Sequence, residues 1–286
     1  MAETDLLRRF PLAMREFGRI RDFVEHNLGI RLPDSKKVMV ESRLQKHLSR
    51  MGAADFSEYC QRLFDQQAPR EELQYFIDLI TTNKTDFFRE PGHFEYLKRQ
   101  ILPEYMQAAR SSGSSPFKVW SAGCSSGEEP YTLIMVLEEF IRDGHDFGYQ
   151  VLASDISEKV LTQARSGVYD RERIATLPQA LKERYFLKAK KPGDPRVRVK
   201  PEYRSKVNYY RVNFMDRSYP VGSGLNAIFF RNVMIYFEKP TQRDIILKLY
   251  SHLKPGGYLF LGHSESLTGI DVSLKNVSAT VYRKEA

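Results

Sequence analysis

The stretch FKVWSAGCSSGEEP, residues 117–130, decides the fold class of this chain. Its first half, FKVWSA, is a short apolar run typical of a buried strand. Small residues and two glycines, Gly123 and Gly127, follow it, and a helical pattern then begins with Pro130 in its first turn. A strand that passes through a tight glycine-containing turn into a helix is the first unit of a doubly wound α/β sheet.

The strand-then-helix pattern continues toward the C-terminus. Apolar strands are predicted within YQVLASDIS, LNAIFFRNVMIYF, KPGGYLFLGHSES and ATVYRKEA. Between them, SEKVLTQARSG and KPTQRDIILKLYSHL have helical periodicity, with Gly167 closing the first and Pro240 near the start of the second. Residues 117–286 are therefore expected to form a mostly parallel sheet with helices on both faces.

Residues 1–82 predict a separate, all-α domain. A first helix has apolar residues on one face, namely Phe17, Ile20, Phe23 and Val24. Two further helices are expected at 55–66 and 70–80. The polar cluster TTNKTDFFREPGHF (81–94) and the stretch ARSSGSSP (109–116) both predict breaks in regular structure. We interpret residues 83–116 as a linker between the two domains.

A helix expected at 34–51 carries a basic face. Asp34 or Ser35 is predicted to cap its start, and Gly52 to end it. One stripe of this helix is apolar, and a second stripe comprises Lys36, Arg43, Lys46, His47 and Arg50. An exposed basic helix face favours docking of an acidic partner.

The net charge of +8 is concentrated in one segment. Residues 171–211 hold 13 basic and 4 acidic residues, whereas residues 1–90 hold 15 of each. The same region contains RVRVKPEY beside PGDP, which predicts a small antiparallel β-subdomain inserted at about 170–207. Its basic surface is either a docking site for nucleic acid, an acidic protein or a membrane surface, or a solvated loop.

Composition excludes several classes of protein. With 42% hydrophobic residues the chain is not disordered, and no apolar run is long enough for a membrane span. The N-terminus MAETDLLRRF has no signal-sequence pattern. Cys60 and Cys124 are the only cysteines, so neither a disulfide framework nor a zinc site is expected. We expect a cytoplasmic monomer with no metal ion and no membrane insertion.

Polar groups follow the strands where ligands of open α/β sheets bind. They are Gly123–Glu129, Asp155, Asn213 and Arg231-Asn232. The adjacent Glu128 and Glu129 would repel a pyrophosphate but attract an ammonium group, which favours a nucleoside with an amino-acid tail. Each position has a structural alternative: carboxylates favour a helix N-terminus, and Asp155 is suited to capping the helix that begins near Ser157.

Five segments carry a resemblance to a known family: TTNKTDFFRE, WSAGCSSGEEPYT, ASDIS, FFRNVMIYF and LKPGGYLFLGHSES. They resemble the CheR-type chemotaxis receptor methyltransferases, over nearly the whole chain. The resemblance implies a class I (Rossmann-like) methyltransferase domain after an all-α domain, with a β-subdomain inserted. It also implies methylation of glutamate side chains on the cytoplasmic helices of chemoreceptors, with S-adenosylmethionine as methyl donor, S-adenosylhomocysteine as product and glutamyl methyl esters as the modified side chains.

The resemblance implies a set of cofactor-binding residues: Asn83, Thr85, Arg89, Glu129, Asp155, Asn213, Phe214, Arg231 and Asn232. Reasoning from the residues alone selects Glu129, Asp155, Asn213 and Asn232, but interprets Asn83, Thr85 and Arg89 as a polar linker.

No general base is required for this reaction. A glutamate carboxylate has an unperturbed pKa of about 4.3 and is already a nucleophile at neutral pH. The enzyme must instead orient it and exclude water. Arg89 is the candidate for holding the carboxylate by one oxygen, and Tyr236 for orienting it through the hydroxyl, both supported by the resemblance. The alternative for Tyr236 is a core aromatic, and His263 is interpreted only as a hydrogen-bonding neighbour.

Receptor contacts are implied for the basic helix, at Lys36, Arg43, Lys46 and Arg50. Some family members bind a receptor tether with a glycine-rich loop of the β-subdomain. Here the corresponding KAKKPGDPRVRV has only Gly193, so we expect a tether-independent enzyme.

Two alternatives from other classes remain. A nucleic-acid methyltransferase is suggested by the basic segment, but RNVMIYF lacks the Asn/Asp-Pro-Pro-aromatic motif of enzymes that methylate the adenine amino group. Enzymes that methylate cytosine at C5 need a nucleophilic cysteine, whereas Cys124 lies in the cofactor turn. A non-catalytic module that senses S-adenosylmethionine would not need both Arg89 and Tyr236.

Overall fold

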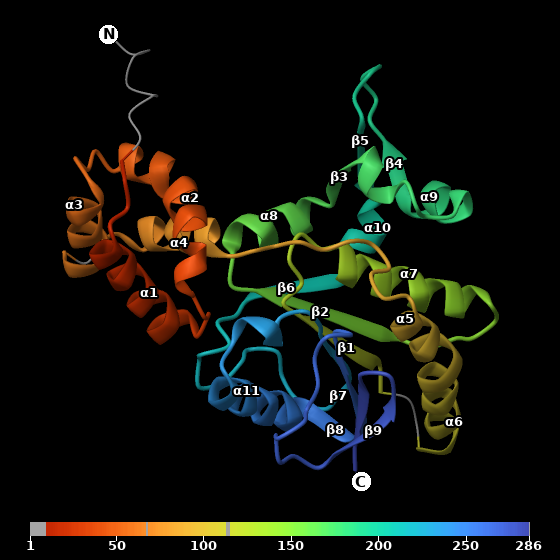
Figure 1. Ribbon diagram of the computed structural model, residues 1–286. Coiled ribbons are helices and arrows are strands. Elements are labelled where there is room, and N and C mark those ends of the chain that lie inside the picture. Colours follow the sequence, from red (N-terminus) through yellow and green to blue (C-terminus); the bar gives the residue numbers. More distant parts are fainter. Residues whose placement is uncertain (1–9, 67, 113–114, 286) are drawn as a thin grey trace. The chain divides into compact units, whose positions relative to one another are not determined.

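The structure is a computed structural model that describes residues 10–66, 68–112 and 115–285. The chain forms two compact units, shown in Figure 1. The helical unit runs to Thr82 and includes Tyr236–Glu238, and the α/β unit comprises Asn83–Ile235 and the chain from Lys239 onward. The interpretation of MAETDLLRRF rests on residues 1–9, which lie outside the described residues, as do residues 113 and 114 of the predicted loop.

The helical unit is built from the predicted amphipathic helices. They are α1 (Met14–Leu28), α2 (Lys37–Arg50), α3 (Phe56–Cys60), which continues as a π-helical turn (Gln61–Asp65), and α4 (Arg70–Ile80). Each helix buries its apolar stripe; Phe17, Ile20 and Val24 of α1 are fully buried, as are Val40, Leu44 and Leu48 of α2. Phe23 stacks on Phe64 with ring centroids 4.5 Å apart. Hydrophobic burial of these stripes holds the unit together.

The predicted N-cap of the basic helix is wrong. Neither Asp34 nor Ser35 caps α2, because residues Asp34–Lys36 form a 3₁₀ turn and move the capping position to Lys36, whose side chain makes no cap. The carboxylate of Asp34 accepts a hydrogen bond from Arg21 at 2.9 Å instead. Gly52, with φ of 63°, follows the end of the helix as expected.

The α/β unit contains a seven-stranded sheet in the order β6-β2-β1-β7-β8-β10-β9. The parallel strands are β6 (Val207–Arg211), β2 (Tyr149–Asp155), β1 (Phe117–Ala122), β7 (Leu225–Phe230) and β8 (Leu253–Leu261). The antiparallel edge comprises β10 (Val281–Lys284) and β9 (Leu274–Ser278). This confirms a mostly parallel class I sheet. The strands β6 and β9 were not expected, because both are polar edge strands without an apolar run.

Helices cover both faces of this sheet (Figure 1). The helices α7 (Glu128–Arg142) and α8 (Glu158–Ser166) lie on one face, and α11 (Lys239–His252) lies on the other. Pro130 is in the first turn of α7, as predicted. Among the described residues, no helix is long and apolar enough to cross a membrane.

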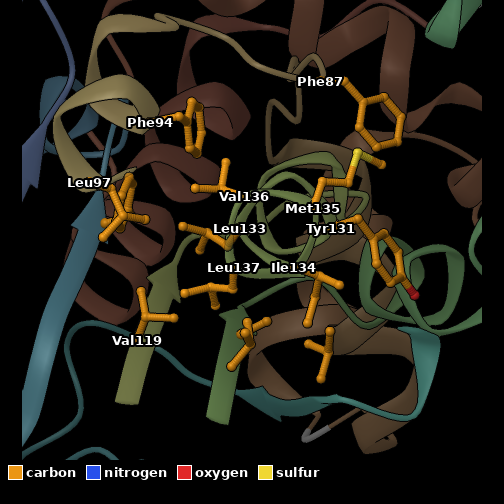
Figure 2. Packing of buried hydrophobic residues seen from close by; sticks show 14 of the residues in the cluster. Phe87, Phe94, Leu97, Val119, Tyr131, Leu133, Ile134, Met135, Val136 and Leu137 are labelled. Carbon is orange, nitrogen blue, oxygen red and sulfur yellow. The ribbon is translucent and has the colours of Figure 1, made fainter. Parts of the chain in front are cut away.

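The segment that we interpreted as a linker is largely helical. It contains α5 (Gly92–Tyr96), a π-helical stretch (Leu97–Ile101) and α6 (Leu102–Ser112), which also fills part of the predicted break at 109–116. Phe94, Leu97 and Ile101 are buried in the same core as α7. Figure 2 shows Phe87 and Phe94 entering this cluster beside the side chains of α7. These helices were not predicted because the flanking Gly, Pro and Ser residues indicated loops, and the apolar spacing between them was given less weight.

The inserted β-subdomain is confirmed. It is a three-stranded antiparallel sheet in the order β3-β5-β4, from β3 (Val168–Asp170), β5 (Arg196–Val199) and β4 (Phe186–Lys188). A 3₁₀ turn (Arg171–Ile174) and α9 (Gln179–Tyr185) lie between β3 and β4, and α10 (Pro201–Arg204) follows β5.

Candidate active site

Backbone strain marks three loops of the α/β unit. Among the described residues, five that are not glycine have positive φ, and four of them are Phe88 (52°), Glu90 (56°), Ser125 (49°) and Asn232 (58°). Such conformations cost free energy and are maintained at functional sites. The loops concerned are residues 83–90, the turn after β1, and the residues after β7. We call the first of these the 83–90 loop.

The turn after β1 depends on its glycines. The amides of Gly123 and Cys124 both donate to the carbonyl of Ser154 at 2.8 Å. Gly123 and Gly127 have φ of 86° and 98°, and a Cβ atom on Gly123 would lie 2.5 Å from the side chain of Val233. Larger residues would therefore push this turn away from the end of the sheet.

Asp155 connects two loops at the end of β2. Its carboxylate accepts hydrogen bonds from the amide of Ser125 at 2.9 Å and from that of Ser157 at 3.0 Å. Ser157, not Asp155, is the N-cap of α8, because its hydroxyl accepts from the amide of Val160. Asp155 is thus a buried acceptor at the carboxyl edge of the sheet, where a ribose would bind.

A buried ion pair joins the start of α7 to the residue after β7. The Glu129 carboxylate accepts from the Ser121 hydroxyl at 2.6 Å and from the Arg231 guanidinium at 3.0 Å. Burial raises the pKa of Glu129, and Arg231 opposes that rise. Arg231 also donates to Glu90 at 3.1 Å and to the carbonyl of Arg89. One guanidinium, with 2% of its side chain exposed, therefore fixes the 83–90 loop against α7.

Two acidic residues that sequence reasoning missed hold Asn232 in its strained conformation. Glu90 accepts from the side-chain amide of Asn232 at 3.2 Å, and buried Glu265 accepts from its backbone amide at 2.9 Å. Burial raises the pKa of Glu90, but the Arg231 cation and hydrogen bonds from Asn232 and the His263 amide outweigh burial and leave the pKa below its usual value. A Cβ atom on Gly262 would lie 2.4 Å from the Asn232 amide. Glu90 and Glu265 lie in FFRE and GHSES, within two of the segments that resemble the CheR-type family. That position was the one sequence signal that could have identified them.

Three residues of this network also have metal-ligating side chains. Atoms of Glu90, His93 and His263 lie within 4.8 Å of one another. Both oxygens of Glu90 already accept hydrogen bonds, and the Arg231 cation lies against one of them. We therefore interpret the cluster as part of the ion-pair network rather than as a metal centre.

The protonation state of His93 predicts a pH dependence of stability. Burial, together with the nearby Arg231 cation, lowers the pKa of His93 to about 4, and the ring forms a hydrogen bond with the Thr280 hydroxyl at 2.9 Å. Because the unfolded chain binds this proton more readily, the contribution to stability is present above about pH 6.5 and is lost as the pH falls toward 4. We expect the free energy of unfolding of the wild type to fall over that range more steeply than that of His93→Gln. Denaturant titrations at pH 7 and pH 5 measure the two free energies of unfolding. An equal fall between these pH values in the wild type and in His93→Gln would contradict the prediction.

The 83–90 loop is attached to its surroundings through its backbone. The carbonyl of Asn83 accepts from the Ser125 hydroxyl at 3.0 Å, and the amide of Phe88 donates to the Thr132 hydroxyl at 3.2 Å. Arg89 is half-buried, and its guanidinium donates to the carbonyl of Lys84 at 3.1 Å. These contacts hold the backbone of the loop that carries Asn83, Thr85 and Arg89.

Asn213 and Phe214 lie after β6, next to the loop of Asp155. The amide of Val212 donates to the carbonyl of Asp155 at 3.0 Å. The Asn213 side chain accepts from the amide of Met215 at 3.0 Å, and buried Phe214 packs edge-on against Phe230 with centroids 5.0 Å apart. The topology therefore brings the residues after β1, β2, β6 and β7 to one edge of the sheet.

Family models match both units of the chain. Residues 83–283 match "CheR methyltransferase, SAM binding domain", and residues 15–81 match "CheR methyltransferase, all-alpha domain". The chain belongs to the CheR methyltransferase family. It is an S-adenosylmethionine-dependent methyltransferase, as the resemblance implied.

Curated members of the CheR family are similar along nearly their whole length. The chain is 39% identical over 270 residues to the chemotaxis protein methyltransferase of Borreliella burgdorferi, covering 94% of each protein. It is 39% identical to that of Salmonella typhimurium, covering 97% of this chain and 92% of the relative. It is 37% identical to that of Escherichia coli, covering 97% and 93%.

The chemistry of the side chains at this edge of the sheet suits the cofactor of the CheR family. S-adenosylmethionine presents ribose hydroxyls, an adenine ring and an amino-acid group with both charges, and this edge of the sheet offers carboxylates, side-chain amides and a guanidinium. In the described parts of the chain, the buried Nε of Arg231 has no hydrogen-bond partner. A buried donor left over by the protein is suited to an acceptor on a ligand.

Tyr236, the second CheR residue expected to orient substrate, belongs to the helical unit, whereas Arg89 belongs to the α/β unit. Its carbonyl accepts from the amide of Arg31 at 2.8 Å, and the next residue, Phe237, pairs with Ile30. The Tyr236 side chain is half-buried.

The basic stripe of the CheR helical unit is less exposed than predicted. His47 is fully buried, bonded to Tyr59 at 2.9 Å and Glu72 at 2.8 Å, and burial lowers its pKa. Arg43 donates to the last carbonyls of α4, at Leu79, Ile80 and Thr81. His47 therefore belongs to the core, and Arg43 acts partly as a helix cap, because the stripe lies at the boundary with α4.

The remaining stripe residues do face solvent. Lys36 and Lys46 are exposed, and Arg50 is exposed while it pairs with Glu72 at 2.6 Å and lies 3.9 Å from the centre of the Tyr75 ring.

Proposed function

We propose that this protein transfers the methyl group of S-adenosylmethionine to glutamate carboxylates on chemoreceptor cytoplasmic helices, forming glutamyl methyl esters. One observation carries the proposal. The 83–90 loop, which bears Arg89, is held at the carboxyl edge of the sheet by the Arg231–Glu90–Asn232 network. The relatives named as chemotaxis protein methyltransferases support the choice of substrate.

The proposed cofactor contacts come from several loops. Asp155 would accept hydrogen bonds from the ribose, and Asn213 and Phe214 would contact the adenine. Glu129 and Arg231 form an ion pair, so their opposite charges lie side by side and suit the ammonium and carboxylate groups of the cofactor's amino-acid part. The loop residues Asn83, Thr85, Arg89 and Asn232 complete the set.

The chemistry then depends on orientation. The cofactor supplies a methyl group on a sulfonium, and the substrate carboxylate supplies the electron pair, so opposite charges cancel as the bond forms. Strong stabilisation of either ion would oppose the reaction. Arg89 would hold one carboxylate oxygen and leave the other free. Tyr236 belongs to the helical unit, and its role as the second orienting residue stays a prediction from the sequence.

For receptor binding we propose the exposed part of α2, with Lys36, Lys46 and Arg50 as its cations and Arg43 at its margin. The methylated receptor helices are expected to be rich in glutamate, so complementary charge would steer association. We also propose that the enzyme acts in the cytoplasm as a monomer. It would act without a receptor tether, because the loop between Lys188 and Val199 has one glycine, Gly193, and is not glycine-rich.

Charge reversal on α2 tests this surface. Lys46→Glu is expected to raise the KM for a receptor fragment about tenfold at low salt, because an exposed attractive pair becomes repulsive, and the effect should shrink at 0.5 M salt. Affinity for S-adenosylhomocysteine should not change. Lys239→Glu, the same change outside α2, is the matched control. Equal KM values for the Lys46 variant and wild type would contradict the surface.

The proposed function is tested by transfer of a radiolabelled methyl group to purified receptor cytoplasmic fragments, with base-labile methanol as readout. Base-labile label on glutamate supports it. Cofactor binding without label on any fragment, or label on RNA or DNA in parallel reactions, would refute it. Neither the nucleic-acid nor the sensing alternative is favoured by family membership.

A further inference from the structure

The β-subdomain contacts the 83–90 loop through an aromatic anchor. Phe87, 5% exposed, lies between Tyr169 of β3 and Phe186 of β4. The ring centroids are 5.1 and 5.6 Å apart, and both pairs have the edge-to-face arrangement that aromatic rings prefer. The apolar interior of the β-subdomain thus includes a residue of the loop.

Arg173, in the 3₁₀ turn directly after β3, makes a second and polar contact with the same loop. Its guanidinium donates to the Asp86 carboxylate at 3.1 Å and to the carbonyl of Thr85. It also donates to Glu128 at 2.5 Å. Glu128 is fully buried in the first turn of α7 and accepts a further bond from Ser126. One side chain of the β-subdomain therefore joins the 83–90 loop to the helix that follows the turn after β1.

A third contact reaches that turn itself. The hydroxyl of Tyr169 donates to the carbonyl of Ser126 at 2.7 Å. A Cβ atom on Gly127 would lie 2.9 Å from this hydroxyl, so the glycine permits the close approach. The β-subdomain accordingly holds two of the loops that we assign to the cofactor.

We propose that Arg173 is a positioning residue for S-adenosylmethionine, which acts by fixing the 83–90 loop to Glu128 and so couples the β-subdomain to cofactor binding. This rests on the proposed role of that loop in cofactor binding. The loop contains Phe88 and Glu90 in strained conformations, so it requires contacts from outside to keep its shape. Without Arg173, binding would have to order the loop, and that entropy cost lowers affinity.

The coupling is reciprocal. If the β-subdomain favours cofactor binding, the bound cofactor must stabilise the β-subdomain by the same free energy.

Calorimetric titration of the full chain with S-adenosylhomocysteine tests the proposal without methyl transfer. Arg173→Ala is expected to weaken binding about tenfold, the usual scale for losing charge-assisted hydrogen bonds at a partly exposed site. Arg171→Ala removes the same charge two residues away, on an exposed side chain, and should bind like wild type. Arg173→Lys should recover part of the affinity. At saturating cofactor, kcat on a receptor fragment should stay near wild type while the KM for S-adenosylmethionine rises.

Hydrogen exchange gives a second readout. In the ligand-free protein, Arg173→Ala should speed exchange of the amides of residues 83–90, and S-adenosylhomocysteine should slow exchange in residues 168–199 of the wild type. If Arg173→Ala does not fold, Asp86→Asn removes the negative charge from one exposed partner of Arg173 and should weaken binding about threefold.

Equal affinity of wild type and Arg173→Ala, or equal losses in the Arg171 and Arg173 variants, would overturn the proposal. For a non-folding Arg173→Ala, wild-type affinity of Asp86→Asn would do the same. A wild-type protein that binds no S-adenosylhomocysteine would instead refute the proposed function of the site.

Discussion

Replacing Arg89 by alanine is expected to lower the kcat of receptor methylation by about a hundredfold or more, the scale of losing the orientation of a reacting group. The reason is geometric: the substrate carboxylate is already charged, so Arg89 contributes orientation and not deprotonation. The backbone of the loop should persist, because Arg231 binds the carbonyl of residue 89 and not its side chain. The assay is transfer of labelled methyl to a receptor fragment at saturating cofactor.

Arg89→Lys is the matched control for charge. Lysine keeps the positive charge but lacks the planar fork, so we expect an intermediate kcat. Titration with S-adenosylhomocysteine separates the two proposed roles of Arg89, since a pure orienting role leaves affinity nearly unchanged. A kcat of Arg89→Ala within threefold of wild type would rule out the orienting role.

Replacing Arg231 by alanine is expected to destabilise the α/β unit by about 3–5 kcal/mol, the usual cost of breaking a buried ion pair on one side. Arg231 is the shared partner of Glu129 and Glu90, whose side chains are 13% and 12% exposed. Its removal leaves two carboxylates in a poorly solvated place and frees the 83–90 loop. Denaturant unfolding at pH 7 measures the loss.

Arg283→Ala is the matched comparison on the surface. Arg283 pairs with Glu104, and both side chains are more than 40% exposed, so its loss should cost less than about 1 kcal/mol. Adding Glu129→Gln to Arg231→Ala should recover part of the stability, because one unpaired charge disappears. Equal destabilisation by the Arg231 and Arg283 variants would contradict the importance of the buried network.

Several features of the α/β unit follow directly from local sequence. FKVWSAGCSSGEEP predicted β1, its turn and α7, because an apolar run, glycines and an early proline are local signals that need no distant partner. The helices of residues 14–28 and 37–50 followed from apolar spacing in the same way. The strands β6 and β9 have polar sequences and could not be predicted from local patterns. They form because they pair with the edges of a sheet that other segments build.

In the candidate site, too, some features follow from local sequence and others depend on distant segments. The positions of Glu129, Asp155, Asn213 and Asn232 after successive strands could be predicted, since parallel strands bring their carboxyl ends to one edge. The partners of these residues could not. Glu90 reaches Asn232 across 142 positions, and Glu265 reaches it across 33, which no local pattern encodes. The buried state of His47 was missed because Glu72 and Tyr59, which satisfy it, come from other helices.

The sequence by itself determined the class of fold, the order of its elements and, through the resemblance, the family. Only the tertiary structure decided which charges are free and which are paired. Residues that the sequence assigns to one basic stripe of α2 are exposed or buried according to what packs against them, as exposed Lys46 and buried His47 show. Likewise, the sequence shows Arg173 only as one of the cations of a basic segment, whereas the tertiary structure pairs it with Asp86 and Glu128. Burial and charge pairing depend on segments that are distant in the sequence and meet only in the fold.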